Sequence, residues 1–419
     1  MMNSGSIRIM KSTFFLRKTW ISSMSEAERK GKRFAAIWGN GDYGRLGLGG
    51  LESHWRPAFC SALANESLRQ IACGGAHTLF LTETGCVYAT GLNDFGQLGV
   101  SNQSYSTDPI KVCKLPKEVI SISAGYHHSS AITVNGELYV WGRNSRGQLG
   151  LGKKAAKVIP VPTKVDCLSG VSIKMAALGS EHSIAVSDKG EVLSWGHGAG
   201  RLGHGHDKGL LKFLKSNTEY TPRLIKTLEG VKIKSVAAGM LHSACVDGTA
   251  ENGSVFVHGE TTLNKMELQQ PNNVATPSML IKLPIADVVA CGGYHTCVVT
   301  SGGELYSWGS NENGCLGIGC TNVSSSPERV QGPFLKSPIN EVSCGWKHTA
   351  AISEGNVYTW GWGGSHGTFA DDGHSSGGQL GQGNDVDYNI PTVVNLWKNV
   401  KALQVSCGFN HTGAILEWN

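Results

Sequence analysis

Short segments in which apolar residues alternate with polar ones follow one another from Phe34 to the end of the chain. In one pair, SSAITV and ELYVWG are separated by Asn135-Gly136, and in another, IAVSD and EVLSWG are separated by Lys189-Gly190. Alternation over a few residues with a glycine-containing turn between the segments is typical of β-hairpins. Because the same region holds no long 3.6-residue hydrophobic period with capping residues, the pattern predicts an all-β protein.

These segments belong to a longer repeat. A glycine followed three residues later by histidine and then by threonine or serine occurs seven times, and a second signature, such as WGRNSRGQLG from Trp141, recurs in step with it. Neighbouring histidines of the first signature lie 51 to 63 residues apart. A unit of this length with about four strands cannot bury both faces of its own sheet, whereas radial stacking in a β-propeller can. The repeated histidines are His77, His128, His182, His242, His295, His348 and His411.

The two ends of the repeat region are complementary. The first unit, FAAIWGNGDYGRLG from Phe34, has only the second signature, and the last unit, VSCGFNHTGAIL from Val405, has only the first. Together they make one unit, so the N-terminal strand is expected to complete the sheet begun by the C-terminal strands, which leaves no exposed sheet edge at the seam. We therefore expect a seven-bladed propeller over residues 34–419, preceded by a separate segment, residues 1–33.

The paired signatures GxxH[ST] and WGxNxxGQLG, in this order and phase over residues 34–419, resemble the repeats of the regulator of chromosome condensation family. The resemblance implies a seven-bladed β-propeller. It implies less about function, because the family includes a nucleotide exchange factor for a nuclear small GTPase, a plant ultraviolet-B photoreceptor, ubiquitin-ligase domains and organelle proteins, and function must be argued from sites. The long loop in the sixth blade and the basic leader are most similar to those of plant organelle-targeted members.

The excess positive charge is confined to the leader. Residues 1–33 hold eight basic and two acidic residues, whereas the remainder of the chain has a net charge of −1. A basic, serine-rich segment without acidic residues before Glu26 is typical of a mitochondrial or plastid transit peptide, and we expect mitochondrial import. Two alternatives remain: RKGKR at residues 29–33 resembles a nuclear localisation patch, and the segment could be a disordered tail without a targeting role.

The repeated histidines are expected to be structural. Each is followed by a hydroxyl residue and recurs once per blade, which favours hydrogen bonding between blades, whereas a metal ion needs ligands that converge on one point. Four cysteines, Cys73, Cys291, Cys344 and Cys407, precede the glycine of the first signature where other blades carry alanine or leucine, so they are interpreted as small buried side chains. The sequence therefore predicts no metal site. Trp346 is the one tryptophan at its repeat position, whereas several blades of the ultraviolet-B photoreceptor carry one, so photoreception is not expected.

Departures from the repeat are the candidate binding sites, because loops on a rigid scaffold carry function. One lengthened connection, HGHDKGLLKFLKSNTEY from His204, adds three lysines, and a second departure replaces the signature of the fifth blade, where His258-Gly259 stands in place of Trp-Gly. The third is the loop WGGSHGTFADDGHSSGGQLG from Trp362, whose acidic and imidazole groups match no known metal or acid–base motif; we expect a partner contact, with a metal site or a plain solvated loop as the alternatives. The candidate partner-binding residues are Lys208, Lys212, Lys215, His366, Asp371, Asp372 and His374.

No catalytic motif accompanies these loops. The chain has no P-loop, GxSxG or HExxH sequence, so we expect no enzymatic activity and no cofactor. It also has no apolar run near the roughly 18 residues of a membrane helix, so we expect no membrane span. The predicted function is a mitochondrial protein-interaction scaffold that supports organelle RNA processing, such as splicing, or ribosome-related assembly. The alternatives are a guanine-nucleotide exchange factor for a small GTPase and a chromatin or ubiquitin-pathway adaptor. Direct RNA contact stays open, because the propeller's net charge of −1 offers no broad cationic surface.

Overall fold

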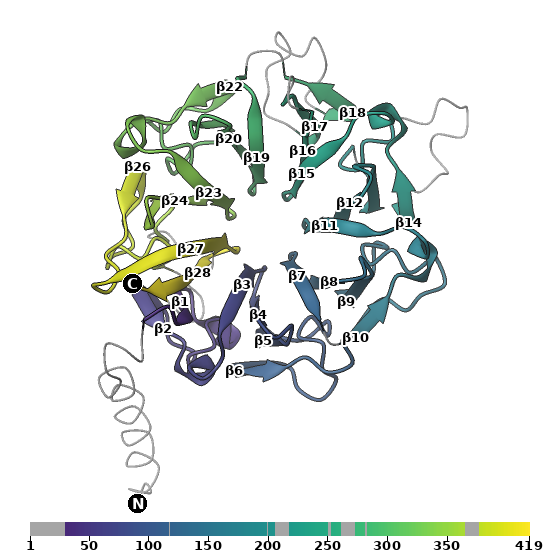
Figure 1. The fold of residues 1–419 in the computed structure, drawn as a ribbon, viewed down its shortest axis with the longest axis horizontal. Coiled ribbons are helices and arrows are strands. Elements are labelled where there is room, and N and C mark those ends of the chain that lie inside the picture. The colour runs from purple at the N-terminus through teal and green to yellow at the C-terminus, as the bar shows by residue number, and fades with distance from the viewer. Residues whose placement is uncertain are drawn as a thin grey trace, which may run out of the picture.

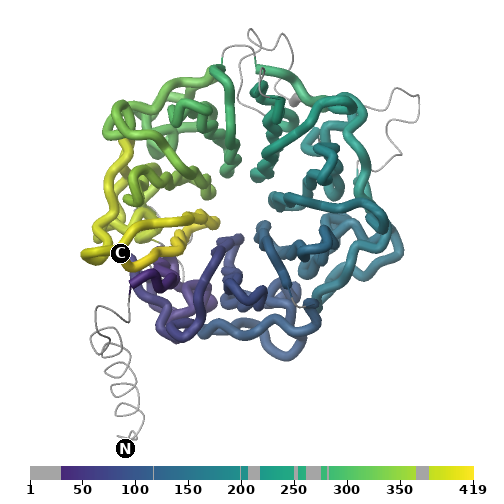
Figure 2. The backbone as a smooth tube through the Cα atoms, viewed as in Figure 1, coloured from purple at the N-terminus to yellow at the C-terminus, as the bar shows by residue number. Residues whose placement is uncertain are grey.

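The computed structural model describes residues 30–116, 118–198, 200–205, 218–249, 253–260, 273–280, 283–364 and 377–419. Seven four-stranded antiparallel sheets are arranged as blades around a central channel (Figures 1 and 2). The predicted all-β, seven-bladed propeller is confirmed. Among the described residues, no helix has the length and apolarity that crossing a bilayer requires.

In six blades the strand order follows the chain from the channel to the outer edge, and in the seventh the two outer strands come from the N-terminal end of the repeat region. The innermost strands are β3 (Leu68–Cys73), β7 (Val119–Ala124), β11 (Ile173–Leu178), β15 (Ile233–Ala238), β19 (Ala286–Cys291), β23 (Ile339–Cys344) and β27 (Val400–Cys407). The second strands all begin at a repeated histidine: β4 (His77–Thr82), β8 (His128–Thr133), β12 (His182–Ser187), β16 (His242–Asp247), β20 (His295–Thr300), β24 (His348–Ser353) and β28 (His411–Trp418).

The outer half of each blade comes from the second signature and the connection that follows it. The third strands are β5 (Val87–Leu92), β9 (Leu138–Arg143), β13 (Val192–His197), β17 (Val255–Glu260), β21 (Leu305–Gly309), β25 (Asn356–Gly361) and β1 (Arg33–Gly39). The fourth strands are β6 (Tyr105–Lys111), β10 (Val158–Lys164), β14 (Thr218–Leu224), β18 (Asn273–Met279), β22 (Ser324–Arg329), β26 (Tyr388–Val393) and β2 (His54–Phe59). Short 3-10 turns lie at Asp42–Gly44, Ser61–Leu63, Asp166–Leu168, Lys226–Leu228 and Pro333–Leu335.

The seventh blade joins the two ends of the repeat region, as the half-units predict. Its strand order is β2-β1-β28-β27, and β1 pairs with β28 from Arg33 opposite Glu417 to Gly39 opposite His411. The Arg33 guanidinium also donates to the Glu417 carboxylate at 2.8 Å. Arg33, which the sequence places at the end of the leader, is therefore the first residue of the closing strand.

The core lies between neighbouring blades and is built around the tryptophans of the second signature. Trp38, Trp141, Trp195, Trp308 and Trp360 are almost fully buried. Four of the indole N–H groups, those of Trp38, Trp141, Trp195 and Trp360, donate to a carbonyl of the neighbouring blade; Trp141 donates to the Gln97 carbonyl at 2.8 Å and Trp360 to the Cys315 carbonyl at 2.9 Å. A buried ring whose polar atom has a partner in the next blade fixes the distance between the two sheets as well as filling it.

The repeated histidines form a closed series of links between blades. Each Nε2 lies 2.9–3.1 Å from the hydroxyl that follows the histidine of the next blade. The pairs are His77–Ser129, His128–Ser183, His182–Ser243, His242–Thr296, His295–Thr349, His348–Thr412 and His411–Thr78. The last pair connects the seventh blade to the first, so the series runs round the whole ring.

The hydroxyl of each link identifies the histidine tautomer. Ser129 also lies 2.8 Å from the Gln97 carbonyl and Thr412 lies 2.7 Å from the Gln379 carbonyl, and the same contact recurs for Thr78, Ser183, Ser243 and Thr349. A carbonyl only accepts, so the hydroxyl proton is donated to it and the hydroxyl oxygen accepts from the histidine. In these links the histidine is therefore neutral, with its proton on Nε2.

Removing the imidazole ring of one repeated histidine should lower the stability of the propeller without affecting a chemical step. We expect His348→Ala to lower the free energy of unfolding by roughly 1–3 kcal/mol, because Thr412 loses its donor in a buried place. Urea unfolding followed by tryptophan fluorescence measures the change. A variant with unchanged stability would show that the link does not hold the blades together.

The histidines should also make the propeller sensitive to acid. Burial lowers the pKa of His77, His128, His295 and His348 to about 3 and that of His242 to about 4. In the unfolded chain the same groups bind protons near pH 6.5, so stability is complete above that pH and is lost as the pH falls toward the folded-state pKa. Each histidine should contribute about 1.4 kcal/mol of loss per pH unit in that window. Urea titrations at pH 7.5, 6.5 and 5.5 test this, and a stability that stays constant over the range contradicts it.

Candidate interaction face

One face of the propeller combines two sets of connections, and we call it the mouth face. The turns from first to second strand, which carry the Gly-x-x-His signature, lie beside the loops that leave the third strand. The Arg143 amide donates to the His127 carbonyl at 2.9 Å, and the Trp362 amide donates to the Lys347 carbonyl at 2.9 Å. Gly74, Gly75 and their counterparts in all seven blades line the channel at this face. The first variable residue of each Gly-x-x-His turn is therefore presented around one opening.

Aromatic side chains from three of these turns and two adjoining loops form a continuous row, which we call the aromatic strip. Phe95 lies 4.7 Å from His127, Tyr126 lies 4.4 Å from His127 and 5.4 Å from Phe409, measured between ring centroids. Phe409 stacks on Trp346 at 4.3 Å with an interplanar angle of 11°, and Trp346 meets Trp362 edge-on at 5.6 Å. The strip is Phe95, His127, Tyr126, Phe409, Trp346 and Trp362.

Two glycines make room for the strip. Tyr126 and Phe409 come from blades that are separated by the blade of Gly75, and they meet because Gly75 has no side chain. A Cβ atom added to Gly75 would lie 2.3 Å from the Tyr126 carbonyl oxygen and 2.9 Å from its ring. Gly293 does the same for Trp346, whose carbonyl oxygen would lie 2.3 Å from an added Cβ. The arrangement of the strip therefore depends on the small residues between its members as well as on the rings.

Charged groups of both signs border the strip. The Lys347 ammonium lies 4.9 Å from the Trp346 ring centroid and 3.5 Å from the Glu312 carboxylate, and the Arg143 guanidinium lies 5.1 Å from the Phe95 ring. A hollow of about 410 Å³ adjoins Trp346 and is lined by Tyr294, Glu312 and Lys347 among others. An aromatic centre with a mixed-charge rim has the composition of a protein-binding surface.

Titratable groups on this face are held in fixed charge states. Burial and the nearby Arg143 guanidinium lower the pKa of His127 to about 4, so its ring is neutral at physiological pH. Arg45 is buried beneath the face, where its guanidinium donates to Asn410 Oδ1 at 2.8 Å. Burial lowers the pKa of Arg45 to about 10, which still leaves it charged. At physiological pH His127 is therefore neutral and Arg45 is charged.

The candidate residues predicted from the irregular loops lie outside the described residues: Lys208, Lys212, Lys215, His366, Asp371, Asp372 and His374. The described residues that flank the sixth-blade loop reach the mouth face, since Trp362 contacts Trp346 and the Gly378 amide donates to the Gly363 carbonyl at 3.0 Å. The seven repeated histidines are buried between blades and take no part in the strip.

Sequence comparison of repeat positions missed the strip. Trp346 is alone at its repeat position, yet in space it has Phe409 on its face and a second tryptophan, Trp362, at its edge. Trp362 follows the Trp360-Gly361 pair, at the position where other blades carry Leu92, Arg143 or Ser310 and none carries tryptophan. The signal that could have found the strip is the aromatic character of Tyr126, Trp346 and Phe409, which share one position of the signature.

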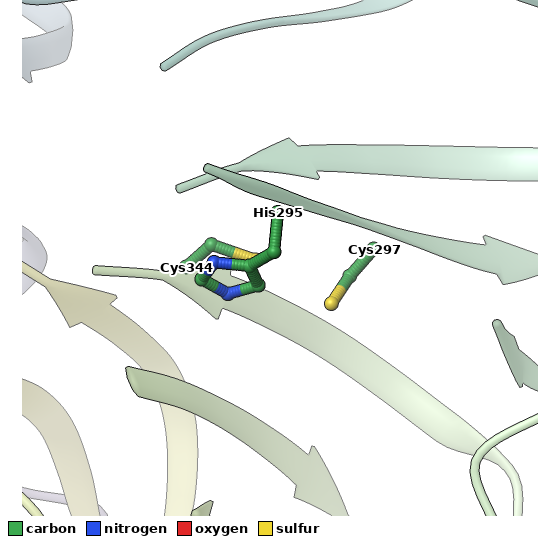
Figure 3. Close-up of side chains that lie close together, drawn as sticks. All are labelled: His295, Cys297 and Cys344. Carbon is green, nitrogen blue, oxygen red and sulfur yellow. The ribbon is translucent and has the colours of Figure 1, made fainter. Parts of the chain in front are cut away.

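One group of metal-ligand types converges elsewhere among the described residues. The ligand atoms of His295, Cys297 and Cys344 all lie within 4.8 Å of one another, between the blades of β20 and β23 (Figure 3). No metal site is predicted from the sequence, because seven-fold repetition spreads the repeated histidines around a circle and not around one point. The signal that could have found this group is the H-x-C of one repeat followed by the cysteine before the signature of the next.

Known proteins share this architecture. The ultraviolet-B receptor UVR8 of Arabidopsis thaliana is 34% identical over 363 residues, which are 85% of this chain and 76% of that protein. The mitochondrial RCC1 domain-containing protein RUG3 of the same plant is 32% identical over 308 residues, 70% of this chain and 65% of that protein. The human probable ubiquitin ligase HERC4 is much longer: the 33% identical region is 86% of this chain but 32% of that protein.

A solved structure has the same fold. Prp20p from Saccharomyces cerevisiae superposes with a TM-score of 0.77 at 22% identity, covering 94% of this chain and 95% of that one. A family model described as the RCC1-like domain matches residues 34–414, which is nearly all of the propeller. On these grounds the chain belongs to the RCC1-like domain family.

Proposed function

We propose that this protein is a non-catalytic scaffold that holds a protein partner on its mouth face. The observation that carries the proposal is the aromatic strip, in which five partly exposed rings rest against each other and on the buried Trp362, with Lys347, Glu312 and Arg143 at the border. Large aromatic side chains that are held rigidly at the centre of a surface are the usual sources of binding energy in protein interfaces, and charges at the rim select the partner. The mixed signs of these charges favour a protein over the uniformly anionic backbone of RNA.

The proposed location is the mitochondrion. Two observations support it: the acid-poor, basic leader, and the similarity to RUG3, whose name places it in mitochondria. Within that compartment we propose a role in RNA processing or ribosome-related assembly, with an RNA-processing complex as the partner. The candidate residues of the loops, including Asp371 and Asp372, remain proposed contacts of that partner.

A second candidate is guanine-nucleotide exchange on a small GTPase. It is favoured by the shared fold with Prp20p, which was studied for its binding to Gsp1p and histones. The two functions differ in a measurable way, because an exchange factor accelerates nucleotide release at substoichiometric amounts whereas a scaffold only binds.

Removing one ring of the aromatic strip should weaken partner binding while the propeller stays folded. We expect Trp346→Ala to reduce partner capture from mitochondrial extract at least tenfold, because Trp346 joins the Phe409 stack to the Lys347–Glu312 pair. Tyr105→Ala is the matched control, since Tyr105 is an exposed aromatic residue of β6. Quantitative mass spectrometry of the captured proteins and RNA, with thermal unfolding of each variant, gives the comparison. Equal capture by both variants, or catalytic release of GDP from a mitochondrial GTPase, would overturn the scaffold proposal.

The leader should direct the protein to its compartment. We expect residues 1–33 fused to a fluorescent reporter to enter mitochondria, and a version with the leader's basic residues changed to glutamine to stay outside, because import receptors and the membrane potential act on positive charge. Fluorescence microscopy with a mitochondrial dye measures this. Nuclear accumulation of both the fusion and the full-length protein would contradict the location and favour the exchange factor.

A further inference from the structure

We propose that His295, Cys297 and Cys344 form a zinc site between two neighbouring blades, with one ring nitrogen and two thiolate sulfurs as ligands. The three ligand atoms lie within 4.8 Å of one another (Figure 3). Bonds of about 2.3 Å to sulfur and 2.0–2.1 Å to nitrogen put neighbouring ligands of a zinc ion somewhat under 4 Å apart. Small side-chain rotations therefore close the group around an ion.

The register of the repeat explains why these residues meet. The residue two positions after each repeated histidine faces the residue that precedes the signature glycine of the next blade. The contact is visible at Gly413, where an added Cβ would lie 3.3 Å from Cys73 Sγ of the neighbouring blade. In the other six pairs at least one of the two is not cysteine: Leu79/Ala124, Ser130/Leu178, Ile184/Ala238, Ala244/Cys291, Ala350/Cys407 and Gly413/Cys73. Only Cys297 and Cys344 put two thiols together.

The histidine of this link is prepared as a ligand. Its Nε2 donates to Thr349 Oγ1 at 2.9 Å, and Thr349 in turn donates to the Cys315 carbonyl at 2.8 Å. The proton is therefore on Nε2, so zinc binding requires the ring to present Nδ1, which lies beside Gly292, to the two sulfurs. Metal-binding histidines characteristically donate the other ring N–H to a fixed acceptor, which sets the tautomer and the ring orientation. The Thr349–Cys315 pair supplies that support here.

The charge balance selects the metal. Cys297 is fully buried, and a metal ion binds cysteines as thiolates. When Zn²⁺ binds, two S–Zn bonds and one N–Zn bond form, and both S–H protons pass to solvent. Two thiolates and one divalent ion then give zero net charge, which suits a buried place, whereas a monovalent copper ion would leave one uncompensated negative charge. Magnesium and calcium prefer oxygen ligands.

The site lies beside two open spaces. Cys344 lines the central channel, which has a volume of about 130 Å³. His295 lines the hollow beside Trp346 on the mouth face. Coordination would connect β20 to β23 by bonds that add to the His295–Thr349 link.

Metal titration of the full-length protein tests the site. The reduced, chelator-treated protein is titrated with zinc against a chromophoric chelator, and with cobalt(II) to detect thiolate-to-metal charge-transfer absorption. We expect one zinc ion per chain. Cys297→Ala and Cys344→Ala should each weaken binding at least 100-fold and reduce the cobalt absorption. Alanine occupies both positions in other repeats, so these variants are expected to fold, which circular dichroism checks.

The matched control is Cys407→Ala. Cys407 stands at the same repeat position as Cys344, in the next blade, and also lines the channel. The Cys407→Ala variant should bind zinc as tightly as the unaltered protein does. The proposal is overturned if the unaltered protein takes up no zinc, if neither Cys297→Ala nor Cys344→Ala weakens binding, or if Cys407→Ala weakens it equally.

Discussion

Every blade of this propeller is tied to the next by a histidine, and in six of the seven links the hydroxyl partner holds that histidine in one tautomer. The hydroxyl that accepts from Nε2 is itself fixed by a carbonyl of the histidine's own blade, as Ser129 is by Gln97, and Trp141 donates to that carbonyl as well. Three side chains and one backbone oxygen therefore form a small closed network at the boundary. Because it is buried, breaking any bond leaves an unpaired polar group, which makes the boundary rigid and specific.

The same turns that hold the blades also present the variable surface. In each Gly-x-x-His turn the glycine and histidine serve packing, and the residue after the glycine lines the channel mouth. Tyr126, Trp346 and Phe409 thus differ from their counterparts without disturbing the links, which lie one or two residues away. In this architecture the residues that vary for binding lie beside residues that packing holds in place.

This division between repeated packing residues and variable surface residues explains which features can be predicted from the sequence. Features that recur, such as the blade count, the strand at which each blade begins and the closure by β1 and β28, follow from the repeat because each unit meets the same packing demand. Features that arise between blades do not. The Tyr126–Phe409 contact depends on the absence of a side chain at Gly75, and the meeting of Cys297 with Cys344 depends on the register of neighbouring sheets. Both are properties of pairs of repeats, whereas a motif describes one repeat at a time.

The pairing of β1 with β28 also sets an order of events in folding. The strand that starts at Arg33 finds its inner neighbour only when the strand that starts at His411 is available, so the closing contact has the greatest sequence separation in the molecule. Until then β1 presents an unpaired sheet edge on one side, and the blades already formed make an open arc. Such edges are prone to pairing with other chains, and contacts of high separation form slowly. The ring is thus most vulnerable to aggregation in the interval just before it closes.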